Sequence, residues 1–231
     1  MVQFFAINGL INALAALALV LYLIAKRNDH RMSFFTILVS IAMCIWSTGY
    51  WLWLSSDTAS STLFFSRMLS IGSTLIPIFI VHWIIVFLKD NNHKIFLQIG
   101  YFITFIFLIF GFSKFFVSGV TQVGYFQFWP QAGLLYTFYI LISYIGFLGY
   151  GLFLLGKYYL KERGLIRPKY RIIFLGMIMC AIGGFTNFPA WYGIPIFPFG
   201  NVLTTFLFFI LGYAILHYRI HSSYMRLFGR I

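Results

Sequence analysis

The sequence predicts an all-α fold: a polytopic membrane protein built as a seven-transmembrane helix bundle. The composition is 61% hydrophobic and only 9% charged, with a mean hydropathy of +0.92, which is not typical of a soluble globular domain. Seven long apolar runs follow one another along 231 residues, and most of them reach the roughly 20 residues that cross a bilayer. The loops between these runs are alternately basic and nearly uncharged.

The basic residues predict the orientation. We place the spans at 4–25, 33–54, 66–88, 95–112, 133–156, 172–188 and 199–217. Fourteen of the sixteen Lys and Arg residues then lie on one side, in the segments 26–31, 89–94, 157–171 and 219–230. Because Lys and Arg accumulate in cytoplasmic loops, we expect the amino terminus outside and the carboxyl terminus in the cytoplasm. The expected location is the inner (cytoplasmic) membrane of the cell, as a multi-pass protein.

The net charge of +12 follows this topology, so it predicts no nucleic-acid partner. The inner loop 157–171 carries six cations and one acid. We expect this loop to contact anionic lipids at the cytoplasmic face of the membrane.

The first three spans carry polar residues at helical spacing. Asn8 and Asn12 lie one turn apart in the first span. The second and third spans repeat the pattern with Ser40, Cys44 and Ser47, and with Ser66, Ser70, Ser73 and Thr74. Small and hydroxyl residues line helix contacts in membranes, so helix packing explains them, but their place in the outer halves also fits a small cavity. Pro77 should kink the third span near mid-membrane.

The later spans are distinguished by glycines and by their connections. The glycines permit close helix approach: Gly146, Gly149, Gly151 and Gly156 in the fifth span, and Gly176, Gly183 and Gly184 in the sixth. We interpret 113–132 as an outer loop rich in aromatic residues. The segment 189–199 has three prolines and no charge, so it cannot be helical throughout, and we expect it to fold back onto the helix ends.

Residues that could carry chemistry are absent from the predicted spans. None of the spans contains Asp, Glu or Lys, the groups that mark proton relays and ion paths in membranes. The two cysteines, Cys44 and Cys180, lie in mid-span, and the five histidines lack metal-ligand spacing. We therefore expect no catalytic residue, no metal site and no cofactor, and the sequence does not predict an enzyme.

Three residues of the third span each allow two interpretations. Arg67, the one cation at the outer end of a span, is either a clamp for an anionic ligand head group or an interfacial arginine that snorkels. Asp57 is the one acid on that side, so it is the expected ion-pair partner of Arg67. His82, towards the inner leaflet, is either a switch or a histidine hydrogen-bonded to a neighbouring helix. Pro77 is either part of a moving element or a static packing device.

Aromatic residues favour a pocket on the outer side. Five of the six tryptophans lie in outer halves or outer loops, namely Trp46, Trp51, Trp53, Trp129 and Trp191. A symmetric interfacial belt would not produce this bias, so it predicts an aromatic-lined pocket for an apolar ligand. The predicted ligand-binding residues are Arg67, Asn187, Asn201, Trp191, Tyr192 and Asn12.

Several motifs, taken in order, resemble a known family. Arg67 is followed by Ile71-Gly72, Ile76-Pro77-Ile78-Phe79 and His82-Trp83. Later come Gly183-Gly184-Phe185-Thr186-Asn187-Phe188-Pro189, Pro195, Pro198, Gly200-Asn201, Gly212-Tyr213-Ala214-Ile215 and Tyr218-Arg219-Ile220. With the basic loop 26–31, this set resembles the seven-helix amino-terminal membrane region of bacterial and archaeal sensor histidine kinases. The resemblance covers nearly the whole chain.

The resemblance implies a membrane signal receptor. A small apolar or lipid-like ligand, extracellular or membrane-borne, would bind in the outer half, and the seventh helix would pass the change to a cytoplasmic output domain, most often a histidine kinase. The sensory domain would span 1–218, and 219–231 would begin a cytoplasmic linker or signalling helix. The sequence lacks a phosphorylatable-histidine helix pair and a nucleotide-binding domain, so we expect the output from a longer protein or a separate partner.

Kinase-type signalling would also favour a homodimer. Two other functions stay open on the sequence. A small seven-helix transporter would carry a midplane site between repeats, and a structural membrane subunit would have no pocket. The absence of charge within the spans argues against the transporter.

Overall fold

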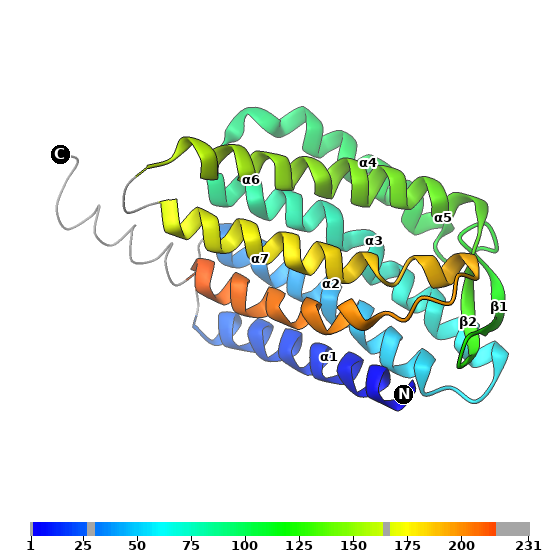
Figure 1. The fold of residues 1–231 in the computed structure, drawn as a ribbon. Helices are drawn as coiled ribbons and strands as arrows, with labels where there is room; N and C mark the ends of the chain where they lie inside the picture. Colours follow the sequence, from blue (N-terminus) through cyan, green and yellow to red (C-terminus); the bar gives the residue numbers. More distant parts are fainter. Residues whose placement is uncertain (1, 27–30, 164–166, 216–231) are drawn as a thin grey trace.

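The computed structural model describes residues 2–26, 31–163 and 167–215, and long helices dominate it (Figure 1). The first four are α1 (Val2–Ala25), α2 (Arg31–Leu54), α3 (Ala59–Leu88) and α4 (Lys94–Phe110). The fifth span consists of α5 (Leu134–Tyr139), η2 (Ile140–Leu148) and α6 (Gly149–Lys161). Then come α7 (Arg167–Phe185) and a last helix, Phe199–Ile215, which opens with the 3₁₀ segment η5 (Phe199–Thr205). Within the described residues, six helices are long and apolar enough to cross a membrane, and the last helix is shorter. The predicted seven-helix membrane bundle is confirmed.

Helix α3 is the centre of the bundle, because it contacts α2, α4 and α6. Helix α7 packs on α6 and on η5, and η5 contacts α1, which closes the arrangement. Glycines set the closest approach. A Cβ atom at Gly72 would lie 2.5 Å from the carbonyl oxygen of Ala42, and one at Gly49 would lie 2.8 Å from the Cα atom of Leu69. Small residues at such crossings let two backbones meet in a membrane.

Several helices are longer than the predicted spans. Helix α3 begins at Ala59, seven residues before the predicted start at Ser66, and the hydroxyl oxygen of Thr58 caps it by accepting from the N–H of Ser61. Its 30 residues extend over about 45 Å, which is more than the roughly 30 Å hydrocarbon core. Helices α6 and α7 also extend into the basic loop between them. Hydropathy marks the apolar stretch of a helix and not the polar turns that continue it.

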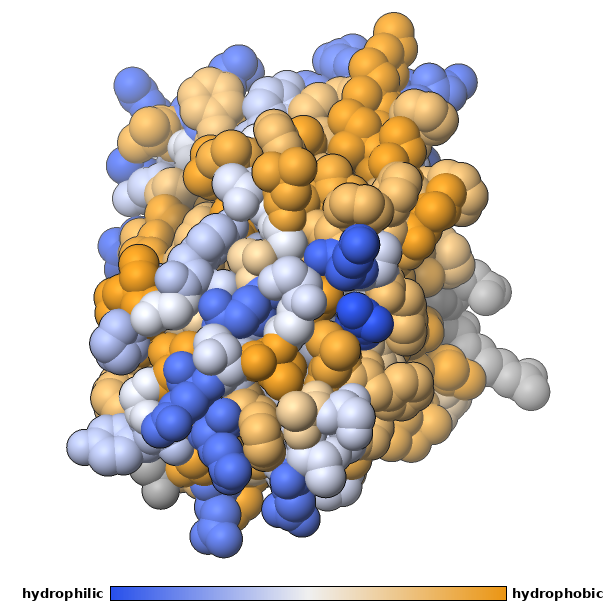
Figure 2. Space-filling model, turned by 90° about the vertical axis from the view of Figure 1, so that its right-hand side faces the viewer, coloured by the Kyte–Doolittle hydropathy of each residue, from blue (hydrophilic) through white to orange (hydrophobic). Residues whose placement is uncertain are grey.

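A β-hairpin covers one end of the bundle (Figure 1). Strands β1 (Val117–Val123) and β2 (Phe126–Ala132) pair antiparallel, and Gly124, with a φ of +56°, lies in the turn between them. The sequence analysis interpreted this stretch as a loop. We call this end the hairpin end, and the opposite end, which carries the loops 89–93 and 162–163, the basic end. Figure 2 looks onto the hairpin end and shows hydrophilic side chains over its middle and lower part.

The proline-rich segment 189–199 folds back onto the bundle, as predicted. Its first turn, η4 (Pro189–Tyr192), buries Trp191, whose ring lies 4.4 Å from that of Tyr136. The ring of Phe197 lies 6.1 Å from that of Phe126 in β2. These contacts join the end of α7 to the hairpin. The predicted domain boundary at residue 218 and the segment 219–231 lie outside the described residues.

Trp83 and Thr36 form a buried polar contact between α3 and α2. The indole nitrogen of Trp83 donates to the hydroxyl of Thr36 over 2.9 Å, and both residues are fully buried. Replacing Thr36 by valine is expected to lower the free energy of unfolding by about 1–3 kcal/mol, because the indole N–H loses its acceptor. Thermal unfolding in detergent measures this. The matched control is Thr62→Val, since the buried hydroxyl of Thr62 has no hydrogen-bond partner among the described residues. Equal losses in the two variants would contradict the prediction.

A polar cluster ties the α3–α4 connection to α6 at the basic end. One carboxylate oxygen of Asp90 accepts from the backbone N–H of Asn92 at 3.1 Å, and the other contacts His93 Nε2 at 3.2 Å and accepts from the Tyr158 hydroxyl at 3.1 Å. The Tyr150 hydroxyl lies 3.1 Å from His93 Nδ1. The Asn92 N–H, followed by the His93 and Tyr158 contacts, lowers the pKa of Asp90 below its usual value.

This lowered pKa predicts a loss of stability in acid. The folded state favours the carboxylate of Asp90, so its contribution is complete at neutral pH and is lost as the pH falls through the folded pKa, below about pH 4. We expect the melting temperature of the wild type to fall on acidification from pH 6 to pH 3, and that of Asp90→Asn to fall less. Asp57→Asn is the control, because Asp57 forms no hydrogen bond or ion pair within the described residues. An identical pH profile for Asp90→Asn and wild type would refute the prediction.

Candidate functional site

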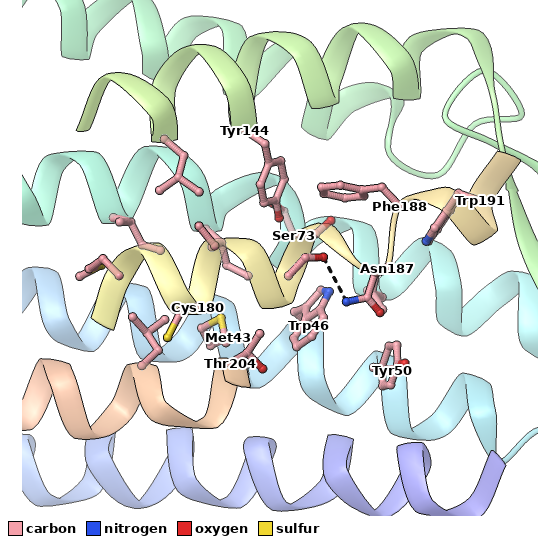
Figure 3. A pocket seen from close by; sticks show the side chains of 18 of the residues that line it. Met43, Trp46, Tyr50, Ser73, Tyr144, Cys180, Asn187, Phe188, Trp191 and Thr204 are labelled. Carbon is pink, nitrogen blue, oxygen red and sulfur yellow. Dashed lines mark hydrogen bonds between the residues drawn. The ribbon is translucent and has the colours of Figure 1, made fainter. Parts of the chain in front are cut away.

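A cavity of about 90 Å³ lies inside the bundle, between α2, α3, the fifth span, α7 and the last helix (Figure 3). A single buried water needs only about 10–15 Å³, so the cavity has room for a small organic group. Its lining residues are Met43, Trp46, Tyr50, Trp53, Leu69, Ser73, Ile76, Ile80, Tyr136, Tyr144, Leu148, Met177, Cys180, Ala181, Gly184, Asn187, Phe188, Trp191, Thr204 and Leu207.

The chemical character of the cavity changes along the bundle axis. Tyr50, Asn187 and Trp191 lie on its hairpin-end side, and Met43 and Cys180 lie on the other side (Figure 3). Among the described residues, no charged side chain lines it. Within the described ranges, no group of three His, Cys, Asp or Glu side chains is arranged to hold a metal ion. The cavity therefore offers aromatic surface and a few neutral polar groups at one end, and aliphatic surface at the other.

Helix α2 supplies the aromatic wall because of its sequence spacing. Trp46, Tyr50 and Trp53 recur at i, i+4 and i+7, so they share one helix face. The rings of Trp46 and Tyr50 stack with their centroids 5.5 Å apart. Trp53 meets Trp191 edge-on at 6.1 Å, and Trp191 stacks on Tyr136. These contacts hold the aromatic rings against one another.

Three buried polar atoms at the hairpin-end side have no hydrogen-bond partner among the described residues. Asn187 uses its amide nitrogen, which donates to the carbonyl of Gly184 at 3.2 Å and to Asn201 Oδ1 at 3.5 Å. Its side-chain oxygen is unpaired, as are the amide nitrogen of Asn201 and the hydroxyl of Tyr50. Most buried polar groups in proteins are hydrogen-bonded. Other buried side-chain atoms of the described residues also lack a partner, but Tyr50 and Asn187 place theirs on residues that line the cavity, where a ligand can reach them.

A polar network behind the cavity joins the last helix to α1. Asn12 donates to the Thr204 hydroxyl at 3.1 Å, and its side-chain oxygen accepts from Thr205 at 2.6 Å. Helix α7 approaches the same turn so closely that a Cβ atom at Gly200 would lie 2.7 Å from the Cα atom of Gly183. The first turns of the last helix are therefore held by α1 on one side and by α7 on the other.

Pro77 frees a backbone carbonyl that two tyrosines bind. Proline has no N–H, so the carbonyl of Ser73, four residues earlier in α3, has no helical partner. The hydroxyls of Tyr139 and Tyr144 donate to this oxygen at 2.7 and 3.2 Å. Helix η2 is a nine-residue π-helix, whose i→i+5 geometry brings residues five apart towards one face. Ser73 and Tyr144 also line the cavity. The cavity wall therefore includes the turn of α3 in which the Ser73 carbonyl has no helical partner.

The structure brings four of the six predicted ligand residues together. Asn187 and Trp191 line the cavity, and Asn201 and Asn12 lie directly behind it in the network with Thr204. Tyr192 is apart from them, about half exposed, with its hydroxyl 2.9 Å from that of Thr137.

Arg67 lies outside the cavity lining. Its guanidinium donates to the carbonyl of Val117 at the start of β1, over 3.2 Å. Within the described residues it forms no ion pair with Asp57, so that expected pairing is wrong. The hairpin supplies the acceptor, the Val117 carbonyl. The sequence could not predict this contact, because it depends on where the hairpin lies in the tertiary structure.

His82 contacts a neighbouring helix. Its Nδ1 atom lies 2.8 Å from the hydroxyl of Tyr101 in α4, and its ring stacks against Phe35 in α2. It does not line the cavity, and a switch role for His82 stays a prediction.

Ser73 belongs to the polar pattern of the third span, for which a small cavity was one of two interpretations, and it lines the cavity. Tyr144 and Met177, which also line it, were not predicted from the sequence. Tyr139 and Tyr144 are five residues apart, a spacing that does not place two residues on one face of an α-helix. The π-helix brings them to one face, so the pair could be recognised only in the structure. Tyr50 had a usable signal, because it shares a helix face with Trp46 and Trp53.

Residues 10–223 match the family model described as the N-terminal 7TM region of histidine kinase. The comparison with curated proteins found no match. The family match covers the first span from residue 10 onwards and the other six spans in full, in agreement with the resemblance of the motifs. It implies a cytoplasmic signalling domain or partner, and it describes the input region of such proteins. The chain therefore belongs to the family of amino-terminal seven-transmembrane regions of histidine kinases, the membrane sensory input domains of these proteins.

Proposed function

We propose that this sensory domain is a receptor for a small apolar ligand that binds in the cavity and changes the position of the last helix. One observation carries this proposal. The cavity is lined by the aromatic face of α2 on one side. On the other side it is lined by Asn187, which follows α7, and by Thr204 in the last helix, the helix that would change position. A ligand there would contact both sides of the bundle at once. It can bias the bundle only if it binds one helix arrangement better than another.

The first turns of the last helix are suited to such a change. Segment η5 is a 3₁₀ helix of seven residues, longer than the three or four that are usual. A 3₁₀ helix rises about 2.0 Å per residue and an α-helix about 1.5 Å. Conversion of seven residues would therefore shift the following helix along its axis by about 3.5 Å. The output would be the cytoplasmic domain or partner, a histidine kinase.

In the membrane, the hairpin end would face outside and the basic end would face the cytoplasm. The Lys and Arg bias of the loops supports this orientation, and the inner membrane would be the location. Loop 157–171 would contact anionic lipid, and the signalling form would be a homodimer. Arg67 and Tyr192 would then position the hairpin and the 189–199 segment around the ligand site.

A cavity-filling variant tests the ligand site. Ala181 lines the cavity, so Ala181→Leu would occupy its space. A library of apolar compounds is screened by thermal unfolding of the purified protein in lipid nanodiscs. A compound at a hundredfold excess over its Kd should stabilise the wild type by about 2.7 kcal/mol.

We expect the hits to bind Ala181→Leu at least tenfold more weakly. The control is Gly212→Leu, because an added side chain at Gly212 meets open space, and this variant should keep full affinity. Hits that bind Ala181→Leu as tightly as the wild type would place the site elsewhere. A complete absence of hits would count against the receptor proposal.

A further inference from the structure

We infer that the ligand of this cavity is an uncharged amphiphile with one hydrogen-bonding group that both donates and accepts, such as an alcohol or a primary amide. Its polar group would lie at Tyr50 and Asn187, and its apolar part would extend towards the middle of the bundle. This inference rests on the proposed function, that the cavity is a ligand site.

The unpaired polar atoms define the head-group site. Tyr50, Asn187 and Asn201 are 1%, 7% and 0% exposed. Their polar side-chain atoms are therefore shielded from bulk water. Tyr50 and Asn187 line the cavity. There the side-chain oxygen of Asn187 offers an acceptor and the hydroxyl of Tyr50 offers a donor. Asn201 lies behind the cavity wall, where its amide is close enough to interact with the Tyr50 hydroxyl, but the two groups do not meet the geometry of a hydrogen bond. A group that donates once and accepts once would satisfy this set.

The lining excludes a charged head group. An anion would need a counter-ion when it leaves water, and none of the described side chains that line the cavity is cationic. Arg67 is directed to the carbonyl of Val117 instead. Without a partner, the burial of a carboxylate here would oppose binding.

The aromatic wall is better suited to an apolar contact than to a cation. A quaternary ammonium binds over the open face of an aromatic ring. The rings of Trp46 and Tyr50 stack on each other with an interplanar angle of 26°, and those of Tyr136 and Trp191 with one of 13°. In each pair, one face of each ring is therefore covered by its neighbour.

The remaining surface of the cavity is suited to an alkyl chain. Away from the polar group it is lined by Met43, Ile76, Ile80, Leu148, Met177 and Leu207. Methionine is flexible and adapts to irregular apolar shapes. The order of polar and apolar groups along the bundle axis sets the direction of the bound molecule, with its head towards the hairpin end.

Four probes of equal chain length test this inference: 1-octanol, octane, octanoate and octyltrimethylammonium. Trp46, Trp53 and Trp191 line the cavity, so binding is followed by tryptophan fluorescence of the protein in nanodiscs. The signal of Ala181→Leu, whose cavity is filled, is subtracted to remove simple partition into lipid. We expect 1-octanol to bind at least tenfold more tightly than each of the other three.

Tyr50→Phe tests the head-group site, since it removes a hydroxyl that has no partner and so leaves the protein's own hydrogen bonds intact. It should bring the affinity for 1-octanol down to within threefold of that for octane. Asn187→Leu should do the same. Equal binding of octane and 1-octanol by the wild type, or tightest binding of either ion, would overturn the inference and leave the ligand site standing. Signals that match Ala181→Leu for all four probes would overturn the inference together with the proposed function.

Discussion

A valine in place of Gly72 is expected to destabilise the whole bundle. The added Cβ atom would lie 2.5 Å from both the carbonyl oxygen of Ala42 and the backbone nitrogen of Trp46. Overpacking a core costs about 1–3 kcal/mol and sometimes more. The contact atoms here belong to the α2 backbone, which cannot rotate away like a side chain, so we expect a loss at or above the upper end of that range.

The measurement is thermal unfolding of the purified protein in detergent, with Gly212→Val as the matched control. Gly212 is also helical, but a Cβ atom there meets nothing within 4 Å. The control separates the helix propensity of valine from the steric effect. The two variants melting at the same temperature would mean that α2 and α3 do not meet as closely as the structure shows. Because Trp46 lines the cavity, Gly72→Val should also abolish ligand binding under the proposed function.

The second large effect is expected from removing both tyrosine hydroxyls at the Ser73 carbonyl. Tyr139→Phe or Tyr144→Phe alone leaves one donor, so each should lower the free energy of unfolding by about 1 kcal/mol. The double variant leaves the freed carbonyl without a donor from either tyrosine. An unsatisfied buried acceptor costs about 1–3 kcal/mol, so the double variant should lose more than the sum of the two single variants.

Pro77→Ala provides the decisive background. Alanine restores an N–H four residues after Ser73, which can fill the same carbonyl within α3. We therefore expect the double tyrosine variant to lose less stability in Pro77→Ala than in the wild type. A double-mutant cycle measured by chemical unfolding reports this coupling. Identical losses in both backgrounds would show that Pro77 and the two tyrosines act independently.

This arrangement bears on the proposed signalling. Ser73 and Tyr144 line the cavity, and one turn away Pro77 interrupts the hydrogen bonding of α3, the central helix of the bundle. Under the proposed function, a ligand would therefore contact residues that form the hydrogen bonds to the Ser73 carbonyl. Pro77 was one of the two switch candidates predicted from the sequence. The coupling between Pro77 and the two tyrosines tests whether it is part of a moving element. The other candidate, His82, contacts Tyr101 and has no such link to the cavity.

The sequence by itself determined the class of protein, because the bilayer demands long apolar helices that satisfy their own backbone groups. Composition, seven apolar runs and the ordered motifs were enough to predict the membrane bundle and the family, and both are confirmed. The sequence also indicated the aromatic end of the bundle. Asn187 and Trp191 were predicted from their residue types and from their place near the outer ends of the sixth and seventh spans, and both line the cavity.

Only the tertiary structure decided the features that depend on contacts between distant segments. The hairpin forms where its strands can cover the bundle end, and it captures Arg67 through a carbonyl fifty residues away. Tyr139 at the end of α5 and Tyr144 in the π-helix η2 both donate to the carbonyl of Ser73, which Pro77 leaves without a helical partner. The cavity is lined by residues of α2, α3, the fifth span, α7 and the last helix, which lie far apart in the sequence. Periodicity and composition describe one segment at a time, so they could not predict which groups several segments bring together.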